Sequence, residues 1–223
     1  EAVKLVKETS ISTFDGSVQE KLDKIYTFDH DLFLALNFDG GEVMDTLMKV
    51  LTSPAGWTPL FLVMFYLMWR RGSWREVLLF VAVLGLTCLL ADAVAGIGKH
   101  NGWIGSWWQP FEPRLRPMWE PALEGQVHVV REGGLYGTVS GHAANFVSIA
   151  CVGAWFIRRR WMTALLVAMV VVVCYTRIYL AYHYPMDLLW GTLTGCTLSF
   201  VAIQTLKHTP LYTRLQAWRK AQA

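Results

Sequence analysis

The residues best able to do chemistry stand in the last third of the chain, where long apolar runs end. Thr176-Arg177 is followed after five residues by His183 and, after three more, by Asp187. Pro185 suits the first turn of a helix, so Asp187 should lie in that turn with His183 just outside it. A carboxylate in this place can hold the proton of one imidazole nitrogen and leave the other nitrogen free to act as a nucleophile. A surface histidine beside a helix-capping aspartate is the simpler alternative.

Arg177 lies inside the apolar run 170–180. A guanidinium is costly in such a run unless it faces a polar cavity or a partner. Its planar fork matches the oxygens of a phosphate group. Pairing with Asp187, or with carbonyl groups at the helix end, is the alternative. Arg177 therefore indicates phosphate binding only in combination with other anion-binding groups.

A second cluster, Ser140-Gly141-His142, opens another apolar run. Free N–H groups at the start of a helix, with the helix dipole behind them, attract an anion, and Gly141 lets the backbone approach it closely. Ser140 can cap the helix and donate its hydroxyl to the same anion, and His142 can protonate a leaving oxygen. Taken alone, Ser140 is better explained as a simple N-cap.

Arg114 and Arg116 lie in the long polar connection 99–139. Paired arginines in such a loop need be no more than solvated charge. The apolar runs, however, place this loop and both clusters on one side of the predicted bundle. Their coincidence indicates an anion site of fixed cations, histidines and a helix start, which is what phosphoryl transfer requires.

The composition indicates an integral membrane protein. Hydrophobic residues make up 54% of the 223 residues and charged residues only 17%, gathered between apolar blocks. The formal net charge of +3 is too small to predict nucleic-acid binding. The four cysteines lie in apolar runs without ligand-like spacing, so neither a disulfide framework nor a metal site is expected.

Five apolar stretches approach the roughly 17–25 residues that a membrane-spanning helix needs. Helices are expected because lipid offers no partner to open backbone groups. The predicted fold is all-α, an integral membrane bundle of five or six transmembrane helices with amphipathic N-terminal helices. The stretches are residues 54–69, 76–98, 141–157, 161–182 and 186–206.

The same pattern divides the chain into three parts. Residues 1–53 mix charged and apolar residues and are expected to form short amphipathic helices at the membrane surface. A disordered tail up to about residue 20 is the alternative for their first part. Residues 54–206 are the expected transmembrane domain, with 99–139 as its outer loop. Residues 207–223 are expected to form a basic cytoplasmic tail.

Basic residues in short connections predict the orientation. The arginines of segments 70–75 and 158–160 mark the cytoplasmic side, so the candidate site should face the periplasm of a bacterial inner membrane. The same rule places residues 1–53 outside, which requires an earlier signal or membrane segment. Because the sequence starts at Glu1 and not at methionine, such a segment is expected upstream.

The motifs resemble those of the type 2 phosphatidic acid phosphatase superfamily, which also includes vanadium haloperoxidases. That superfamily carries three signatures: Lys, six residues, Arg-Pro; then Pro-Ser-Gly-His; then Ser-Arg, five residues, His, three residues, Asp. The second and third match with one substitution each, Val139 for proline and Thr176 for serine. The resemblance covers roughly residues 28–206 and is nearest to bacterial membrane phosphatases.

The first signature departs from the pattern. Arg116-Pro117 is present, but Gln109 stands where the lysine is expected, and Lys99 is separated from Arg116 by 16 residues. Either an insertion displaces Lys99, which then folds back, or Gln109 replaces the cation with a neutral hydrogen-bond donor. The insertion is favoured because the intervening loop is rich in glycine and tryptophan.

The resemblance implies a role for each matching residue. His183 is the nucleophile that forms a phosphohistidine and is oriented by Asp187, and His142 protonates the departing alcohol and then activates water. No metal or other cofactor is implied. The groups that would hold the phosphoryl oxygens are Arg116, Arg177, Ser140, Gly141 and either Lys99 or Gln109.

The expected function is that of a membrane lipid phosphate or pyrophosphate phosphatase. Its expected partners are a phosphorylated lipid and the bilayer, with no nucleic acid and no oligomeric state predicted. Undecaprenyl pyrophosphate, phosphatidylglycerol phosphate, phosphatidic acid and lipid A phosphates all suit the resemblance. A lipid phosphotransferase with the same site is the alternative, followed by a non-catalytic protein that binds or translocates lipid.

Overall fold

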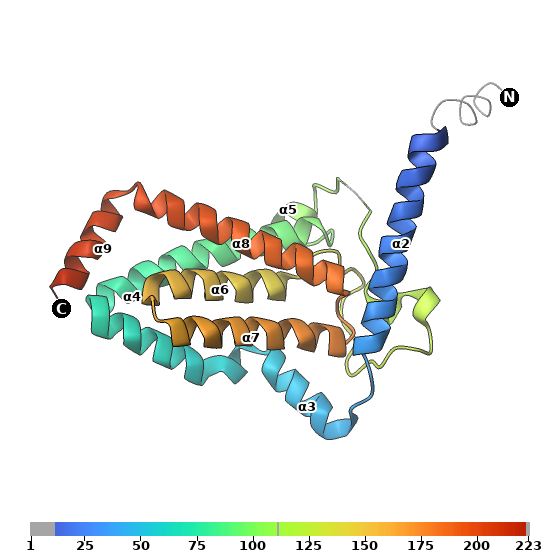
Figure 1. Cartoon of the computed structure of the whole chain (residues 1–223), viewed down its shortest axis with the longest axis horizontal. Helices are drawn as coiled ribbons and strands as arrows, with labels where there is room; N and C mark the ends of the chain where they lie inside the picture. Colours follow the sequence, from blue (N-terminus) through green and yellow to red (C-terminus); the bar gives the residue numbers. More distant parts are fainter. Residues whose placement is uncertain (1–11, 111, 222–223) are drawn as a thin grey trace.

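The computed structural model describes residues 12–110 and 112–221, and this part of the chain is helical. The prediction of an all-α fold is confirmed, since the only β pairing among these residues is one isolated bridge between Leu115 and Tyr136. The helices are α2 (Ser12–Leu36), α3 (Gly41–Thr52), α4 (Thr58–Ile97), α5 (Gly102–Gly105), α6 (Gly141–Ile157), α7 (Arg160–Tyr179), α8 (Pro185–Lys207) and α9 (Pro210–Lys220) (Figure 1).

The helix α4 has two arms. It runs to one end of the molecule, turns back near residues 72–73 and returns to the other end (Figure 1). The second arm joins α5 in one apolar segment, Trp74–Gly105. The two arms correspond to the first two apolar stretches predicted from the sequence.

Three described helices are long and apolar enough to cross a membrane: Trp74–Gly105, Arg160–Tyr179 and Pro185–Lys207. A fourth span results if Gly41–Thr52 and Pro54–Arg71 count as one segment, although they are bent by 78°. The apolar helix α6 has 17 residues and is shorter than the other spans. The described part of the chain therefore contains three or four candidate spans, and the count of five or six remains a prediction.

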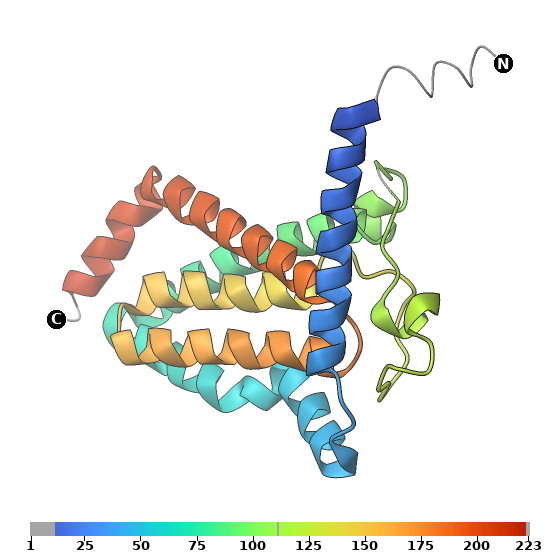
Figure 2. The ribbon, with the colours of Figure 1, turned by 45° about the vertical axis from the view of Figure 1, so that its right-hand side comes forward.

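The centre of the bundle is α6, which packs against α4, α7 and α8 (Figure 2). Two glycines on α8 allow the closest approach, because a Cβ on Gly191 would lie 2.4 Å from the Ser140 carbonyl oxygen. A Cβ on Gly195 would lie 2.4 Å from the carbonyl oxygen of Ala144. The Gly-x-x-x-Gly spacing is typical of helices that touch through their backbones in lipid.

The N-terminal region differs from its prediction in form. Residues 12–36 make one 25-residue helix that projects beyond the bundle at its first end (Figures 1 and 2). At the other end, Asp29 and Phe33 are buried against the bundle. Residues 12–20 belong to this helix, and the first eleven residues lie outside the described part.

The basic tail is also helical as far as Lys220. The helix α9 returns to the bundle and buries Leu215 and Arg219. Arg219 forms an ion pair with Glu76 of α4, whose side chain is fully buried. The C-terminal segment is thus part of the folded domain, because a buried carboxylate requires this partner.

Candidate functional site

His183 and Asp187 form the pair that their spacing predicted. The Nδ1 atom of His183 lies 3.2 Å from Oδ2 of Asp187, and both side chains are buried. The helix α8 starts at Pro185, so Asp187 lies in its first turn. Its Oδ2 atom also accepts a hydrogen bond from the Tyr184 backbone N–H at 3.1 Å. The carboxylate is therefore fixed by the start of its own helix and can hold the imidazole in one orientation.

The turn between α7 and α8 brings His183 back toward Arg177. Ala181 has a positive φ of 57°, and the backbone N–H groups of Tyr182 and His183 donate to the Arg177 carbonyl oxygen at 3.0 and 3.3 Å. Ala181 is fully buried. A left-handed residue at the end of a helix reverses the chain in this way.

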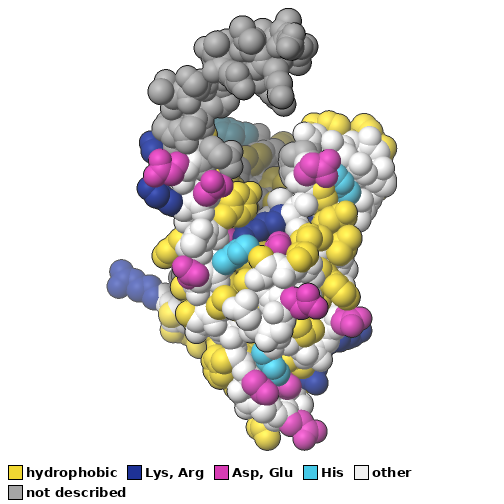
Figure 3. Space-filling view, turned by 90° about the vertical axis from the view of Figure 1, so that its right-hand side faces the viewer, with side chains coloured by type: hydrophobic (Ala, Val, Ile, Leu, Met, Phe, Trp, Pro, Cys, Tyr) yellow, Lys and Arg dark blue, Asp and Glu magenta, His cyan; other side chains and the backbone are white. Residues whose placement is uncertain are grey.

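The start of α6 lies beside this pair. The Ser140 N–H donates to the Asp187 carbonyl oxygen at 3.1 Å, and the Ser140 hydroxyl accepts from the Ala143 N–H at 3.3 Å. The predicted N-cap is confirmed, and its residue also joins α6 to α8. His142 follows in the first turn and is exposed. Figure 3 looks onto this end of the molecule, where Lys and Arg side chains lie at the centre of the face among hydrophobic and histidine side chains.

Arg116 and Arg177 meet on one aromatic ring. The guanidinium carbon of Arg177 lies 4.2 Å from the Tyr182 ring centroid and that of Arg116 lies 5.2 Å from it. Arg177 also donates to the Thr52 hydroxyl at 2.9 Å, while its buried Nε atom has no protein partner among the described residues. Cation–π contact offsets part of the repulsion between the two guanidinium groups.

The position of Arg116 depends on a pairing inside the outer loop. Its backbone N–H donates to the Leu135 carbonyl oxygen at 3.0 Å, and its Nε atom donates to the Tyr136 carbonyl oxygen at 2.9 Å. Gly137 follows directly, and a Cβ there would lie 3.2 Å from Oδ2 of Asp187. The loop segment around Gly137 therefore lies against the dyad, where the smallest residue is needed.

Lys99 and Gln109 lie in different surroundings. The Nζ atom of Lys99 lies 3.8 Å from the place that a Cβ on Gly141 would occupy, at the start of α6. Gln109 is exposed and donates to the carbonyl oxygen of Gly105 at 3.4 Å. The chain folds back after α4, and the backbones of Gly96 and Gly105 come into contact. A Cβ added to Gly105 would lie only 2.1 Å from the Gly96 carbonyl oxygen.

The electrostatics of the site keep the nucleophile candidate neutral. Burial lowers the pKa of His183 well below its ordinary value, and the positive charges of Lys99, Arg177 and Arg116 lower it further. All three cations therefore act on one imidazole, although they come from three separate segments. An unprotonated imidazole is the form that can attack an electrophile.

A second carboxylate supports the dyad from α2. Asp29 is buried, accepts the Met186 N–H at 2.9 Å through Oδ1, and pairs with Arg114 through Oδ2. Arg114 lies 3.6 Å from Oδ1 of Asp187 and stacks on the Tyr184 ring at 3.6 Å. Asp29 lies in the segment 1–53, which was expected to form amphipathic surface helices. Its burial distinguishes it as a residue that supports the dyad.

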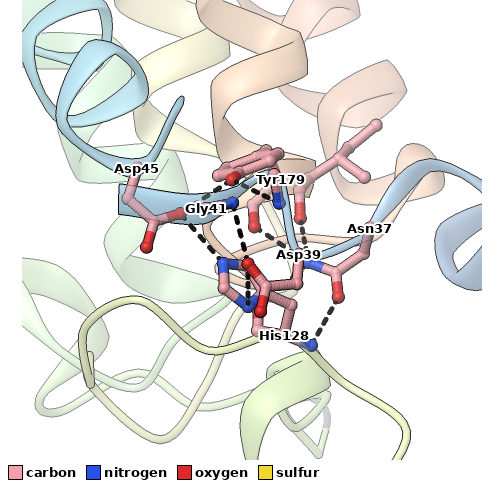
Figure 4. A network of polar contacts seen from close by, with 8 residues as sticks. Asn37, Asp39, Gly41, Asp45, His128 and Tyr179 are labelled. Atoms are coloured by element: carbon pink, nitrogen blue, oxygen red, sulfur yellow. Dashed lines mark hydrogen bonds and ion pairs between the residues drawn. The ribbon is translucent and has the colours of Figure 1, made fainter. Parts of the chain in front are cut away.

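A polar network fixes the Tyr179 end of α7 (Figure 4). His128 contacts Asp45 at 2.9 Å, and the Tyr179 hydroxyl donates to the same carboxylate at 2.7 Å. Asn37 and the His128 backbone exchange two hydrogen bonds of 2.8 and 3.2 Å. His128 thus ties the loop 99–139 to α3 and α7.

Asp92 on the second arm of α4 accepts a hydrogen bond from Asn145 of α6 at 2.9 Å. All four cysteines are free. No group of three or more His, Cys, Asp or Glu side chains in the described residues could hold a metal ion.

Known proteins resemble this chain over most of its length. It is 31% identical to the lipid A 4'-phosphatase of Bacteroides thetaiotaomicron over 172 residues, which cover 75% of this chain and 72% of that protein. It is 26% identical to the lipid A 4'-phosphatase of Porphyromonas gingivalis over 176 residues, 78% of this chain and 71% of that protein.

Two crystal structures share the fold. LpxE of Aquifex aeolicus matches with a TM-score of 0.59 at 21% identity, over 78% of this chain and 93% of that one. A PAP2-type phosphatidylglycerolphosphate phosphatase of Bacillus subtilis matches with a TM-score of 0.59 at 20% identity, over 84% and 89%. Residues 84–209 match the PAP2 superfamily, and this range includes His142, His183 and Arg116. The chain belongs to this superfamily and is a membrane lipid phosphatase of the PAP2 type.

Proposed function

We propose that the protein removes a phosphomonoester group from a glycolipid of the lipid A type, through a phosphohistidine formed on His183. The observation that carries the proposal is the convergence of three cationic side chains on one buried, neutral imidazole. The substrate class rests on the two lipid A 4'-phosphatases that align with three quarters of the chain. A lipid substrate also agrees with the three candidate membrane spans.

In the first step, Nε2 of His183 attacks phosphorus and the bond to the lipid oxygen breaks. The Nδ1 proton stays on the ring and donates to the Asp187 carboxylate, which is 3.2 Å away and whose negative charge stabilises the positive charge that develops on the imidazole. His142 donates a proton to the departing oxygen, for which its exposed position at the start of α6 is suited. The products are the free lipid alcohol and a phosphohistidine.

In the second step, a water molecule attacks the same phosphorus. His142, now neutral, accepts a proton from that water, and the P–N bond to His183 breaks. Inorganic phosphate leaves and both histidines return to their first state. The order of proton transfers is set by the reversal of the first step.

The phosphoryl oxygens are held by fixed positive groups. Arg116 and Arg177 share the Tyr182 ring, so their separation is set before the substrate binds. Lys99, at the Gly141 end of α6, supplies the third cation, and Gln109 has no part in the site. Such preorganised charges are worth about 2–4 kcal/mol each in a transition state, by analogy with oxyanion donors. The Ser140 hydroxyl and the Gly141 N–H complete the set.

The site is proposed to face the periplasm. The end of α6 opposite the dyad carries arginines in two short connections, which is the pattern of a cytoplasmic surface. Labelling of single cysteines introduced at residues 131 and 214 by a membrane-impermeant maleimide tests this orientation. Labelling of position 131 alone in intact cells is expected, and labelling of position 214 alone would reverse the assignment.

The substrate is tested with purified protein and a panel of lipid phosphates. Lipid A bisphosphate, phosphatidylglycerol phosphate and undecaprenyl pyrophosphate are incubated separately, and the lipid products are read by mass spectrometry. The proposal expects loss of one phosphate from lipid A as the fastest reaction. A phosphorylated acceptor lipid in place of inorganic phosphate would identify a phosphotransferase, and faster release from undecaprenyl pyrophosphate would overturn the substrate class.

A further inference from the structure

A second charged cavity lies at the end of α6 opposite the dyad. It has a volume of about 510 Å³ and is formed where the first arm of α4 meets the α6–α7 connection. We call it the arginine pocket. Its lining residues are Tyr66, Leu67, Arg70, Arg71, Ile157, Arg158 and Arg159.

One arginine of this pocket is held in place. The Nη1 atom of Arg71 donates to the Ile157 carbonyl oxygen at 2.7 Å and to that of Phe156 at 3.4 Å. These carbonyls end α6, where the helix dipole is negative, so the guanidinium is bound to the helix terminus. Its position is therefore set by the fold and not by a ligand.

Among the described residues, the other arginines of the pocket have no acidic partner. Arg70 donates to the Tyr66 hydroxyl at 3.3 Å, and Arg158 lies 5.7 Å from the Trp155 ring. No ion pair in the described residues includes any of the four arginines. Glu76, whose charge acts on Arg71, is bound by Arg219 in the buried pair. Within the described part of the chain, no carboxylate neutralises the positive charge of the pocket.

An apolar groove adjoins the arginine pocket. It has a volume of about 460 Å³, lies between the two arms of α4 and shares Tyr66 with the pocket. Polar surface is nearly absent from it. Its lining residues are Leu62, Phe65, Tyr66, Trp69, Trp74, Val77 and Leu78. Tryptophan beside arginine is typical of the boundary between lipid tails and headgroups.

We propose that the arginine pocket and this groove together bind one anionic phospholipid. The phosphodiester headgroup lies among the guanidinium groups, and an acyl chain follows the groove past Trp69 and Trp74. Arginine binds phosphate oxygens in pairs, and basic pockets between membrane helices take such headgroups. This lipid is not the substrate, because 17 residues of α6, about 25 Å of helix, separate the pocket from the dyad. The inference is independent of the proposed function.

The test is lipid retention by the full chain, measured by native mass spectrometry. The purified protein is exposed to equal amounts of phosphatidylglycerol, a phosphodiester that a monoester phosphatase cannot hydrolyse, and zwitterionic phosphatidylcholine. Wild type is expected to retain one phosphatidylglycerol. The triple variant Arg70→Gln, Arg158→Gln, Arg159→Gln is expected to bind it at least about tenfold more weakly. Arg71 stays unchanged because it supports the end of α6.

The control variant carries the same loss of charge outside the pocket: Lys207→Gln, Arg214→Gln and Lys220→Gln. Its binding is expected to stay within about twofold of wild type. Equally weakened phosphatidylglycerol binding in both variants would show diffuse attraction to surface charge. Unchanged binding in both variants would show that the arginine pocket is not the lipid site. Displacement of the lipid by glycerol phosphate at equal concentration would show that a free anion suffices, which also overturns the proposal. The thermal midpoint and the hydrolysis of a water-soluble phosphomonoester confirm that each variant is folded.

Discussion

The two ends of α6 both collect positive charge, but by different means. At the Gly141 end, Lys99, Arg116 and Arg177 come from segments far apart in the sequence and surround a buried histidine. At the Ile157 end, the arginines form two adjacent pairs in the sequence, 70–71 and 158–159, and are mostly exposed, and Arg71 is held by two backbone carbonyl groups. Catalysis benefits from cations that burial and contacts hold in place before the substrate binds. Exposed arginines, whose side chains become ordered when a lipid headgroup binds, are suited to lipid binding.

The largest expected effect of any substitution is at the dyad. His183→Ala should lower kcat by about 10⁴-fold or more, because no other group can form the covalent intermediate. Acid-labile phosphate should be trapped on wild type after rapid quenching and be absent from the variant. His208→Ala, at the far end of α8, is the matched control and should retain full activity. Full activity in His183→Ala would show that His183 is not the nucleophile, and the Gly141 end of α6 would then no longer differ from the Ile157 end by its covalent chemistry.

The next effect separates the two candidates for the first-signature cation. Lys99→Ala should lower kcat/KM about 10²-fold, because it removes a charge at the start of α6. Gln109→Ala should change kcat/KM by less than about threefold, because its side chain is exposed and its hydrogen bond to the Gly105 carbonyl oxygen is long, at 3.4 Å. Steady-state kinetics on the two purified variants give the answer. The opposite ranking would return Gln109 to the site.

The contact between α6 and α8 offers a test through a single methyl group. Gly191→Ala should lower the free energy of unfolding by about 1–3 kcal/mol, because its Cβ would meet the Ser140 backbone and push the helix start away. Gly85→Ala adds the same methyl group where nothing lies within 4 Å, and should be neutral or slightly stabilising. Thermal unfolding followed by circular dichroism compares them. Equal effects would mean that the close approach does not position the site.

A smaller effect is expected for the support from α2. Asp29→Asn should lower kcat about tenfold with KM nearly unchanged, because Arg114 then loses the partner that holds it near Asp187. The double variant with Arg114→Gln should be no worse than the worse single variant. Glu20→Gln removes a carboxylate from an exposed ion pair on the same helix and is the control. Additive losses in the double variant would show that the two residues act separately.

The smallest effect on activity is expected at the Ile157 end. The triple variant of the arginine pocket should hydrolyse a water-soluble phosphomonoester at a rate within about twofold of wild type, because its charges lie a helix length from the dyad. The assay uses detergent without added lipid, so that a bound phospholipid does not contribute. A loss of more than tenfold would mean that the two ends of α6 are coupled.

The dyad and the helix start could be predicted because their geometry is local. His183 and Asp187 are four residues apart at a proline-initiated helix, and Ser140 precedes the helix that it caps. The positions of these residues follow from helix periodicity and from turn chemistry alone. The distance between the dyad and the start of α6 could not be predicted from the sequence, because it depends on the close packing of α8 against α6 at Gly191 and Gly195. The Gly-x-x-x-Gly spacing was present in the sequence and is the signal that was missed.

The supporting residues could not be predicted because their partners are distant in the sequence. Asp29 is 158 positions from Asp187, and a carboxylate on an amphipathic helix normally faces water. The place of Lys99 depends on the backbone contact of Gly96 with Gly105, which no periodicity reveals. The count of membrane spans was uncertain for a related reason: α6 is short, and neighbouring helices cover much of its surface.

The helix α2 projects from the bundle at one end (Figure 2), and near its other end Asp29 accepts the Met186 N–H at the start of α8. Asp29 joins Arg114 to the first turn of α8, so a tilt of the helix would pull on the backbone that carries Asp187. Asp29 therefore connects any partner that contacts the projecting turns of α2 to the backbone around the dyad. The rate of phosphate removal would then depend on that contact as well as on the lipid substrate.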